Sequence, residues 1–151
     1  MKNMLTIIFF LFQILVTHAQ NTNSEIKEIQ KYIQSTSQNE WFDPVNSSGT
    51  LDNGTSYDLS YYVLPDTDIF SIIYTVYDKY TIQKVFYYKD KKLIACILEE
   101  TDANNANKLI RYVDYFYKDG VLINTADENK NLPSNTLLAE GLELQAKALK
   151  N

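Results

Sequence analysis

Two pairs of acidic side chains have the type and spacing that could support acid–base catalysis. Asp66 and Asp68 follow a proline, and Glu99 and Glu100 stand side by side at the end of an apolar run. A glycoside hydrolase needs two carboxyl groups that face each other across a cleft. Asp66 and Asp68 lie in a predicted turn, and adjacent residues of a strand point to opposite faces of a sheet. We therefore interpret both pairs as solvated charges.

A third polar segment has the spacing with which a calcium-binding loop begins. Asp127, Asn129 and Asn131 alternate like the first three ligands of an EF-hand. Leu132, however, occupies the position of the obligatory glycine, and Leu138 occupies the position of the bidentate glutamate. The segment does not predict an EF-hand, and we expect the protein to use no metal and no cofactor.

The sequence lacks most of the side chains on which enzymes depend. Its one histidine, His18, lies near the N-terminus, and its one cysteine, Cys96, lies within the apolar run of residues 93–98. Because reactive thiols occur in polar, electropositive surroundings, we interpret Cys96 as a buried core residue. The alternative is an odd thiol available for pairing or catalysis. The four glycines form neither a phosphate-binding loop nor a nucleophile elbow, and we expect that the protein is not an enzyme.

Residues 1–19 predict a secretory signal peptide. Lys2 supplies a positive charge, an apolar stretch covers residues 4–16, and small residues precede a cleavage site between Ala19 and Gln20. The apolar stretch is shorter than the roughly 20 residues that a membrane-spanning helix needs, so we expect release rather than anchoring. The sequence thus predicts an exported, soluble protein, periplasmic or extracellular, with no membrane attachment after removal of the signal.

Residues 20–151 are predicted to form a single globular domain with an acidic surface. They are numerous enough to bury a substantial core, and one cysteine cannot form an internal disulfide. Without residues 1–19, 13 basic and 19 acidic side chains remain, a net charge of −6. Nucleic acids and anionic membranes bind basic surfaces, so this charge argues against both as partners.

Hydrophobic periodicity predicts two helices that flank a block of strands. Residues 22–34 and 134–149 each place apolar side chains on one helical face. Tyrosine and β-branched residues dominate the segment between them. The predicted strands lie near residues 55–64, 69–78, 81–89, 92–100, 108–118 and 121–125. Residues 46–54 and 101–107 are rich in turn-forming side chains and are predicted as loops.

The predicted fold is α+β: a single antiparallel β-meander of about six strands, with an N-terminal and a C-terminal helix packed on one face. The strands are expected to be antiparallel because every link is too short for a crossover helix. Residues 87–94 and 116–123 match at five of eight positions, and each predicts a hairpin with aspartate at its tip. Asp119-Gly120 is a strong signal for a type I′ turn. The repeat is either a duplicated binding unit or two separate hairpins whose tight turns select the same residue types.

With these hairpins, a leader that ends in His18-Ala19-Gln20 and a closing helix, the chain resembles small uncharacterised exported proteins of Bacteroidota-type bacteria. The resemblance covers most of the chain after residue 19 as layout and is specific at the two hairpins. It implies an antiparallel meander capped by helices. It implies no activity and no functional residue.

Tyrosine is the residue type that remains for recognition, and all twelve tyrosines follow the predicted signal peptide. A sheet with helices on one face leaves its other face to water or a partner, and tyrosine offers rigid area with a polar tip. The candidate binding residues on that face are Tyr87, Arg111, Tyr115 and Tyr117. A one-residue slip in register would instead present Ile110, Tyr112 and Phe116. The alternative is that these rings stabilise cross-strand pairs.

These observations favour an exported, non-catalytic binding or accessory module that acts on a protein or glycan in the cell envelope through its exposed sheet face. An inhibitor of an envelope or extracellular enzyme is the alternative. A carboxylate-dependent hydrolase is a further alternative, disfavoured by the absence of histidine after residue 19.

Overall fold

The computed structural model describes residues 22–38, 43–66, 68–125 and 134–149. They belong to two compact units, Met1–Gln38 and Asn39–Asn151. Residues 22–37 of the first unit are helical, which extends the predicted helix by three residues. Ser35 Oγ donates a hydrogen bond to the Tyr32 carbonyl oxygen at 3.0 Å, and such a bond accommodates serine in the last turn of a helix. The predicted signal peptide and its cleavage site lie outside the described residues.

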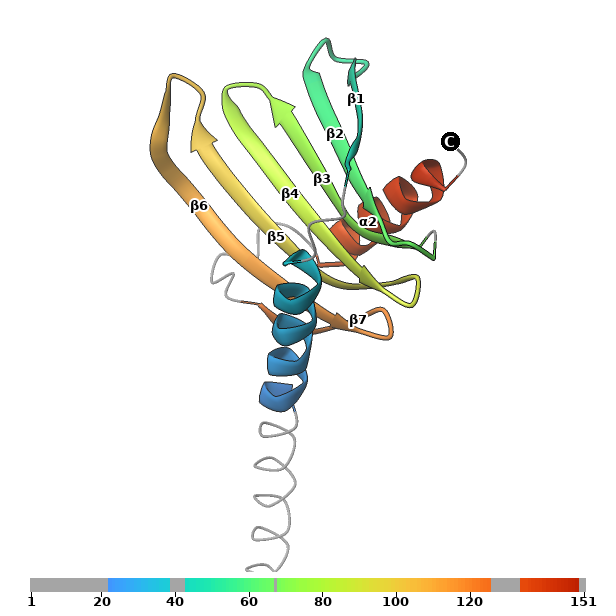
Figure 1. Cartoon of the computed structure of the whole chain (residues 1–151). Helices are drawn as coiled ribbons and strands as arrows, with labels where there is room; N and C mark the ends of the chain where they lie inside the picture. The colour runs from blue at the N-terminus through green and yellow to red at the C-terminus, as the bar shows by residue number, and fades with distance from the viewer. Residues whose placement is uncertain (1–21, 39–42, 67, 126–133, 150–151) are drawn as a thin grey trace, which may run out of the picture. The chain divides into compact units, whose positions relative to one another are not determined.

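The second unit is built on one seven-stranded antiparallel sheet whose strands follow one another in chain order (Figure 1). The strands are β1 (Val45–Thr50), β2 (Ser56–Val63), β3 (Ile69–Tyr77), β4 (Tyr80–Lys89), β5 (Lys92–Asp102), β6 (Asn105–Lys118) and β7 (Val121–Thr125). A helix, α2 (Ser134–Ala148), lies against β3 and β5. The predicted α+β fold with an antiparallel meander is confirmed. Over the described residues, no helix is long and apolar enough to cross a membrane.

The additional strand is β1, which the sequence assigns to a loop. Its polar residues have low strand propensity, but an edge strand needs only one partner, and all six residues of β1 pair with β2. Ser60 Oγ donates a hydrogen bond to Asn46 Oδ1 at 2.6 Å across this pair. The predicted turn remains at residues 51–54, where the Gly54 N–H donates to the Leu51 carbonyl oxygen at 2.8 Å. Tertiary pairing thus overrides local propensity in β1.

The predicted long loop over residues 101–107 is also wrong. β5 continues to Asp102 and β6 begins at Asn105, so a tight turn of two residues joins them. The Asn104 N–H donates to Asp102 Oδ1 at 2.9 Å, so the turn-forming side chains close a hairpin. Two register shifts between β5 and β6 near Thr101 absorb the irregular pairing.

The two repeated hairpins have the same backbone geometry. Asp90 and Lys91 have φ of 50° and 63°, and Asp119 and Gly120 have φ of 49° and 78°, so both turns are left-handed as type I′ requires. Each hairpin also has a register shift at the same repeat position, between residues 87 and 88 and between residues 116 and 117. The predicted tight turn at Asp119 is confirmed.

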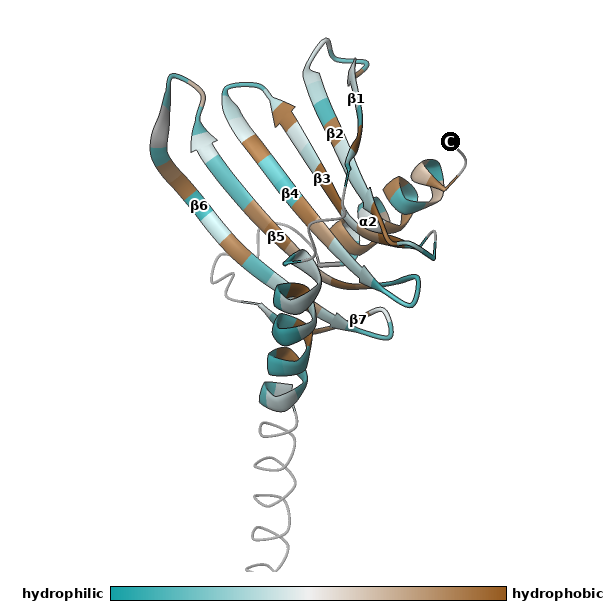
Figure 2. Cartoon of the chain, in the orientation of Figure 1, coloured by the Kyte–Doolittle hydropathy of each residue, from teal (hydrophilic) through white to brown (hydrophobic). Residues whose placement is uncertain are grey.

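Alternation along the strands gives the sheet two distinct faces, as the alternating hydropathy of β4, β5 and β6 in Figure 2 illustrates. We call the face that packs on α2 the α2 face and the other the opposite face. Leu137, Leu144 and Ala148 of α2 belong to a core with side chains of the α2 face: Tyr61, Ile69, Ile72, Phe86, Tyr88, Leu93, Cys96, Leu98, Val113, Tyr115 and Tyr117. This core is the main hydrophobic cluster of the second unit.

Gly141 allows α2 to approach the sheet closely. A Cβ at this position would lie 2.8 Å from Phe86 Cδ1 and 3.3 Å from Leu93 Cδ2. The close approach lets Tyr88 Oη donate a hydrogen bond to the Gly141 carbonyl oxygen at 2.7 Å, which satisfies a buried phenol. Nearby, Lys84 Nζ lies 2.7 Å from Glu140 Oε1 and links β4 to α2.

Candidate functional site

Two of the four candidate binding residues lie in the core. Tyr115 and Tyr117 are each 1 % exposed and pack on the α2 face. Their predicted placement on the face away from the helices is therefore wrong. Both alternating sets of side chains in this strand contain aromatic rings, so hydrophobicity alone does not indicate which set faces α2.

Arg111 lies on the same face as Tyr115, which also differs from its predicted placement. Its Nη2 donates a hydrogen bond to Tyr115 Oη at 3.2 Å. Strand register pairs Arg111 with Glu100 of β5. The guanidinium therefore supplies a partner for a buried phenol at the border of the core.

Tyr87 is the one candidate that lies on the opposite face. Its ring packs edge-on against Phe70, with 5.7 Å between ring centroids. Burial is the main cause that raises the pKa of the Tyr87 phenol, and neighbouring Tyr112 and Asp114 add to the effect. Tyr87 thus lies in a half-buried aromatic setting close to a carboxylate.

Strand register brings the neighbours of Tyr87 together from β5 and β6. Across β4, β5 and β6, the three successive rows of the opposite face are Tyr87–Ala95–Phe116, Val85–Ile97–Asp114 and Gln83–Glu99–Tyr112. Along β6, Asp114 therefore lies between Phe116 and Tyr112, which belong to the two adjoining rows. We call Tyr87, Glu99, Tyr112 and Asp114 the Asp114 cluster.

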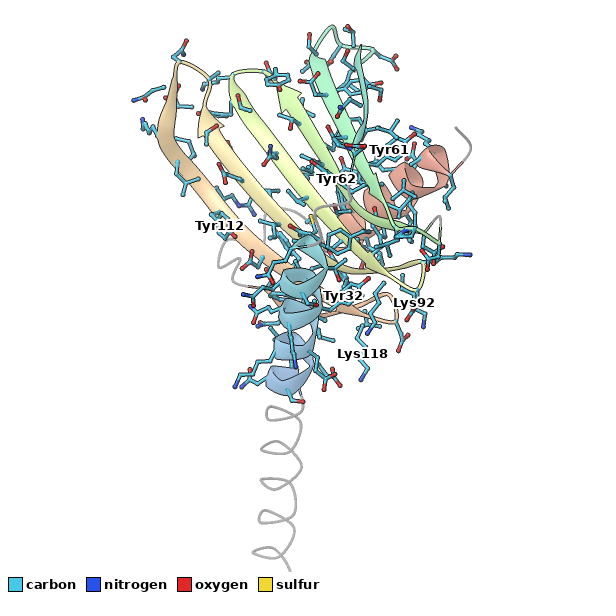
Figure 3. The ribbon with its side chains drawn as sticks, in the orientation of Figure 1. Tyr32, Tyr61, Tyr62, Lys92, Tyr112 and Lys118 are labelled. Atoms are coloured by element: carbon cyan, nitrogen blue, oxygen red, sulfur yellow. The ribbon has the colours of Figure 1, made fainter. Side chains whose placement is uncertain are left out.

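The carboxylate at the centre of the Asp114 cluster is incompletely satisfied. Asp114 Oδ1 is buried and has no hydrogen-bond partner among the residues that the structure describes. Tyr112, on β6 in Figure 3, is 51 % exposed. The pKa of the Tyr112 phenol is raised, and the largest cause is burial. The charge of Asp114, a hydrogen bond to Asp114 and the charge of Glu99 raise it further.

A second tyrosine–aspartate pair on the opposite face provides a comparison. Tyr77 Oη donates to Asp58 Oδ2 at 2.7 Å, and this hydrogen bond is the largest cause that raises the pKa of Tyr77. The pair joins β2 to β3 in an exposed position. Asp58 therefore has a direct phenol partner in an exposed setting, whereas one oxygen of Asp114 is buried without a partner.

The interpretation of Cys96 as a core residue is confirmed. Its side chain is fully buried on the α2 face, and burial raises the pKa of its thiol far above the ordinary range. The thiolate, which is the reactive form of cysteine, is strongly disfavoured there. Cys96 contributes to packing, together with Phe86 in the facing position of β4.

The predicted carboxylate pairs do not converge. Asp66 Oδ1 accepts a bond from the Asp68 N–H at 3.3 Å in the turn before β3, and Lys91 lies 3.6 Å from Asp68. Glu99 pairs with Tyr112, and Glu100 pairs with Arg111, so the two carboxylates lie on opposite faces. Within the described ranges no three metal-ligating side chains lie together. The calcium-like sequence Asp127–Asn131 falls outside those ranges.

Comparison of the chain with protein-family models, curated proteins and solved structures finds no match. The site therefore rests on its own geometry. The candidates predicted for the other register are Ile110, Tyr112 and Phe116, and Asp114, which lies in the same alternating set, is not among them. Charge does not separate the two sets either, because the set that faces α2 contains Arg111 and the alternate set contains Asp114.

Proposed function

We propose that this protein is a non-catalytic binding module that recognises a protein or glycan partner through the Asp114 cluster on the opposite face of the sheet. The observation that carries the proposal is the buried Asp114 Oδ1 without a hydrogen-bond partner, next to the half-exposed ring of Tyr112. Native proteins satisfy nearly all buried polar atoms, and exceptions concentrate at functional sites.

The composition of the cluster supports recognition rather than catalysis. Tyrosine combines apolar area with a hydroxyl group and loses little conformational entropy on binding, which makes it common at interface hot spots. The described acidic pairs do not face each other, and the one thiol is buried with a raised pKa. In this proposal the protein is exported and meets its partner in the periplasm or outside the cell.

The exposed part of β6 extends the proposed surface. Leu109, Ile110 and Tyr112 are 54, 43 and 51 % exposed. β7 pairs with β6 only at residues 115–118, so this stretch precedes the paired part of β6. Exposed apolar side chains next to a polar cluster are typical of a protein interaction surface.

The test compares partner capture by two single variants. Tyr112→Ser removes an exposed ring from the Asp114 cluster, and Leu142→Ser changes a 43 % exposed residue of α2. Tagged proteins are incubated with the envelope fraction of the producing cells, and retained proteins are quantified by mass spectrometry. We expect Tyr112→Ser to lose a partner that wild type and Leu142→Ser both retain, with thermal unfolding unchanged. Equal capture by all three proteins would overturn the proposal.

A further inference from the structure

The Asp114 cluster carries negative charge without a compensating base on its own rows. The nine residues that form the three rows across β4, β5 and β6 include two acids, Asp114 and Glu99, and no lysine, arginine or histidine. Two bases of these strands, Lys84 and Arg111, lie on the α2 face. Lys84 pairs with Glu140 there, and Arg111 donates to Tyr115 Oη.

A buried carboxylate oxygen is costly unless a donor or a positive charge reaches it. Asp114 Oδ1 has no hydrogen-bond donor among the described residues. Tyr112 and Tyr87 are close enough to Asp114 for its charge to act on both phenols. Because both tyrosine ring faces carry negative electrostatic potential, the setting favours a cation with N–H donors over a neutral ligand.

We propose that the Asp114 cluster binds a cationic side chain, the ammonium of lysine or the guanidinium of arginine, that a partner protein presents. The proposal rests on the function proposed above and specifies the chemistry of the partner. An N–H group of the cation donates to the partly exposed Asp114 carboxylate, Glu99 adds a second negative charge, and the rings of Tyr87 and Tyr112 flank the apolar stem. The acidic net charge of the whole chain, −5, favours approach of a basic surface.

The first experiment uses small mimics of the two side chains. Isotope-labelled protein is titrated with n-butylammonium chloride and with n-butylguanidinium chloride while backbone amide resonances are followed. Neutral 1-butanol and sodium chloride at equal ionic strength are the controls. We expect saturable shifts at residues 87 and 112–116 with both cations and none with either control. Equal shifts with 1-butanol, or no saturable shift with either cation, would overturn the proposal.

The second experiment uses a matched pair of variants. Asp114→Asn removes the charge at the centre of the cluster, and Asp58→Asn removes a carboxylate elsewhere on the same face. We expect Asp114→Asn to weaken binding of both cations at least fivefold, with a melting temperature equal to or above that of wild type. Asp58→Asn is expected to bind as wild type does. A cation affinity that Asp114→Asn leaves unchanged would contradict the assignment.

Partner capture separates this inference from the function on which it rests. If Tyr112→Ser loses the partner and Asp114→Asn retains it, the surface recognises a partner without a cation, and the inference fails alone. If both variants retain the partner, the proposed function fails as well. Loss of the partner by both variants, together with loss of wild-type capture after chemical acetylation of the partner's lysines or modification of its arginines, supports both proposals.

Discussion

Replacement of Gly141 by alanine sets two opposed effects against each other. Alanine is favoured over glycine in a helix interior by about 1 kcal/mol, which would stabilise α2. The added methyl group, however, would lie 2.8 Å from Phe86 Cδ1 and 3.2 Å from Phe86 Cε1. Phe86 is fully buried, and because protein interiors are close-packed, a shift of its ring disturbs the side chains around it. Overpacking of a core costs about 1–3 kcal/mol.

A second cost arises at Tyr88. Any outward shift of α2 lengthens the 2.7 Å hydrogen bond from Tyr88 Oη to the Gly141 carbonyl oxygen. A buried hydroxyl left without its partner costs about 1–3 kcal/mol. The two costs exceed the gain in helix propensity, so we expect Gly141→Ala to lower the free energy of unfolding by about 1–3 kcal/mol.

Urea unfolding followed by circular dichroism measures this change, and a double-mutant cycle assigns its cause. Phe86→Leu removes the ring atoms nearest to the new methyl group. In that background we expect Gly141→Ala to be neutral or stabilising, with a coupling energy of about 1 kcal/mol or more. Leu142→Ala, at the exposed neighbour in α2, serves as the control. A gain of about 1 kcal/mol for Gly141→Ala in the wild-type background would refute the close packing of α2 on β4 and β5.

Three further outcomes are expected. Lys91→Gly relieves a non-glycine residue at φ 63° and should stabilise by about 1 kcal/mol in urea unfolding; a loss of stability would contradict the left-handed turn. Tyr115→Ser combined with Tyr117→Ser should destabilise by more than about 4 kcal/mol, because both rings are in the core, and an unchanged melting temperature would remove them from it. Burial raises the pKa of the Tyr88 and Tyr117 phenols, so above pH about 10 the unfolded state ionises first and stability falls as pH rises. The measurement is a pH titration followed by tyrosinate absorbance and by circular dichroism. If all the tyrosines ionised with a single pKa near 10 while the circular dichroism stayed native, the raised pKa values would be contradicted.

Local sequence was sufficient for much of the fold. Strands β2–β7 follow runs of tyrosine and β-branched residues, and short links between them permit only antiparallel neighbours. The turn at Asp119-Gly120 was predictable because only residues that tolerate positive φ fit it. The burial of Cys96 followed from the apolar residues on both sides of it. In each case the determining interaction lies within a few residues of the chain.

Tertiary structure decided the features that depend on distant partners. β1 is a strand because β2 offers it an edge, and nothing in its polar sequence requires that state. Tyr115 and Tyr117 point into the core because their alternating set of β6 side chains packs against α2. The sequence does not indicate which set is buried, because both sets contain aromatic residues.

The candidate site depended on tertiary structure most of all. Tyr87 lies on β4, Glu99 on β5, and Tyr112 and Asp114 on β6, and only the register of these three strands brings them together. The unsatisfied Asp114 Oδ1 is a property of its surroundings rather than of the residue itself. Sequence alone therefore determined that this chain forms a tyrosine-rich meander. Packing of α2 determined which tyrosines of β6 belong to the core, because α2 removes the side chains of the α2 face from water.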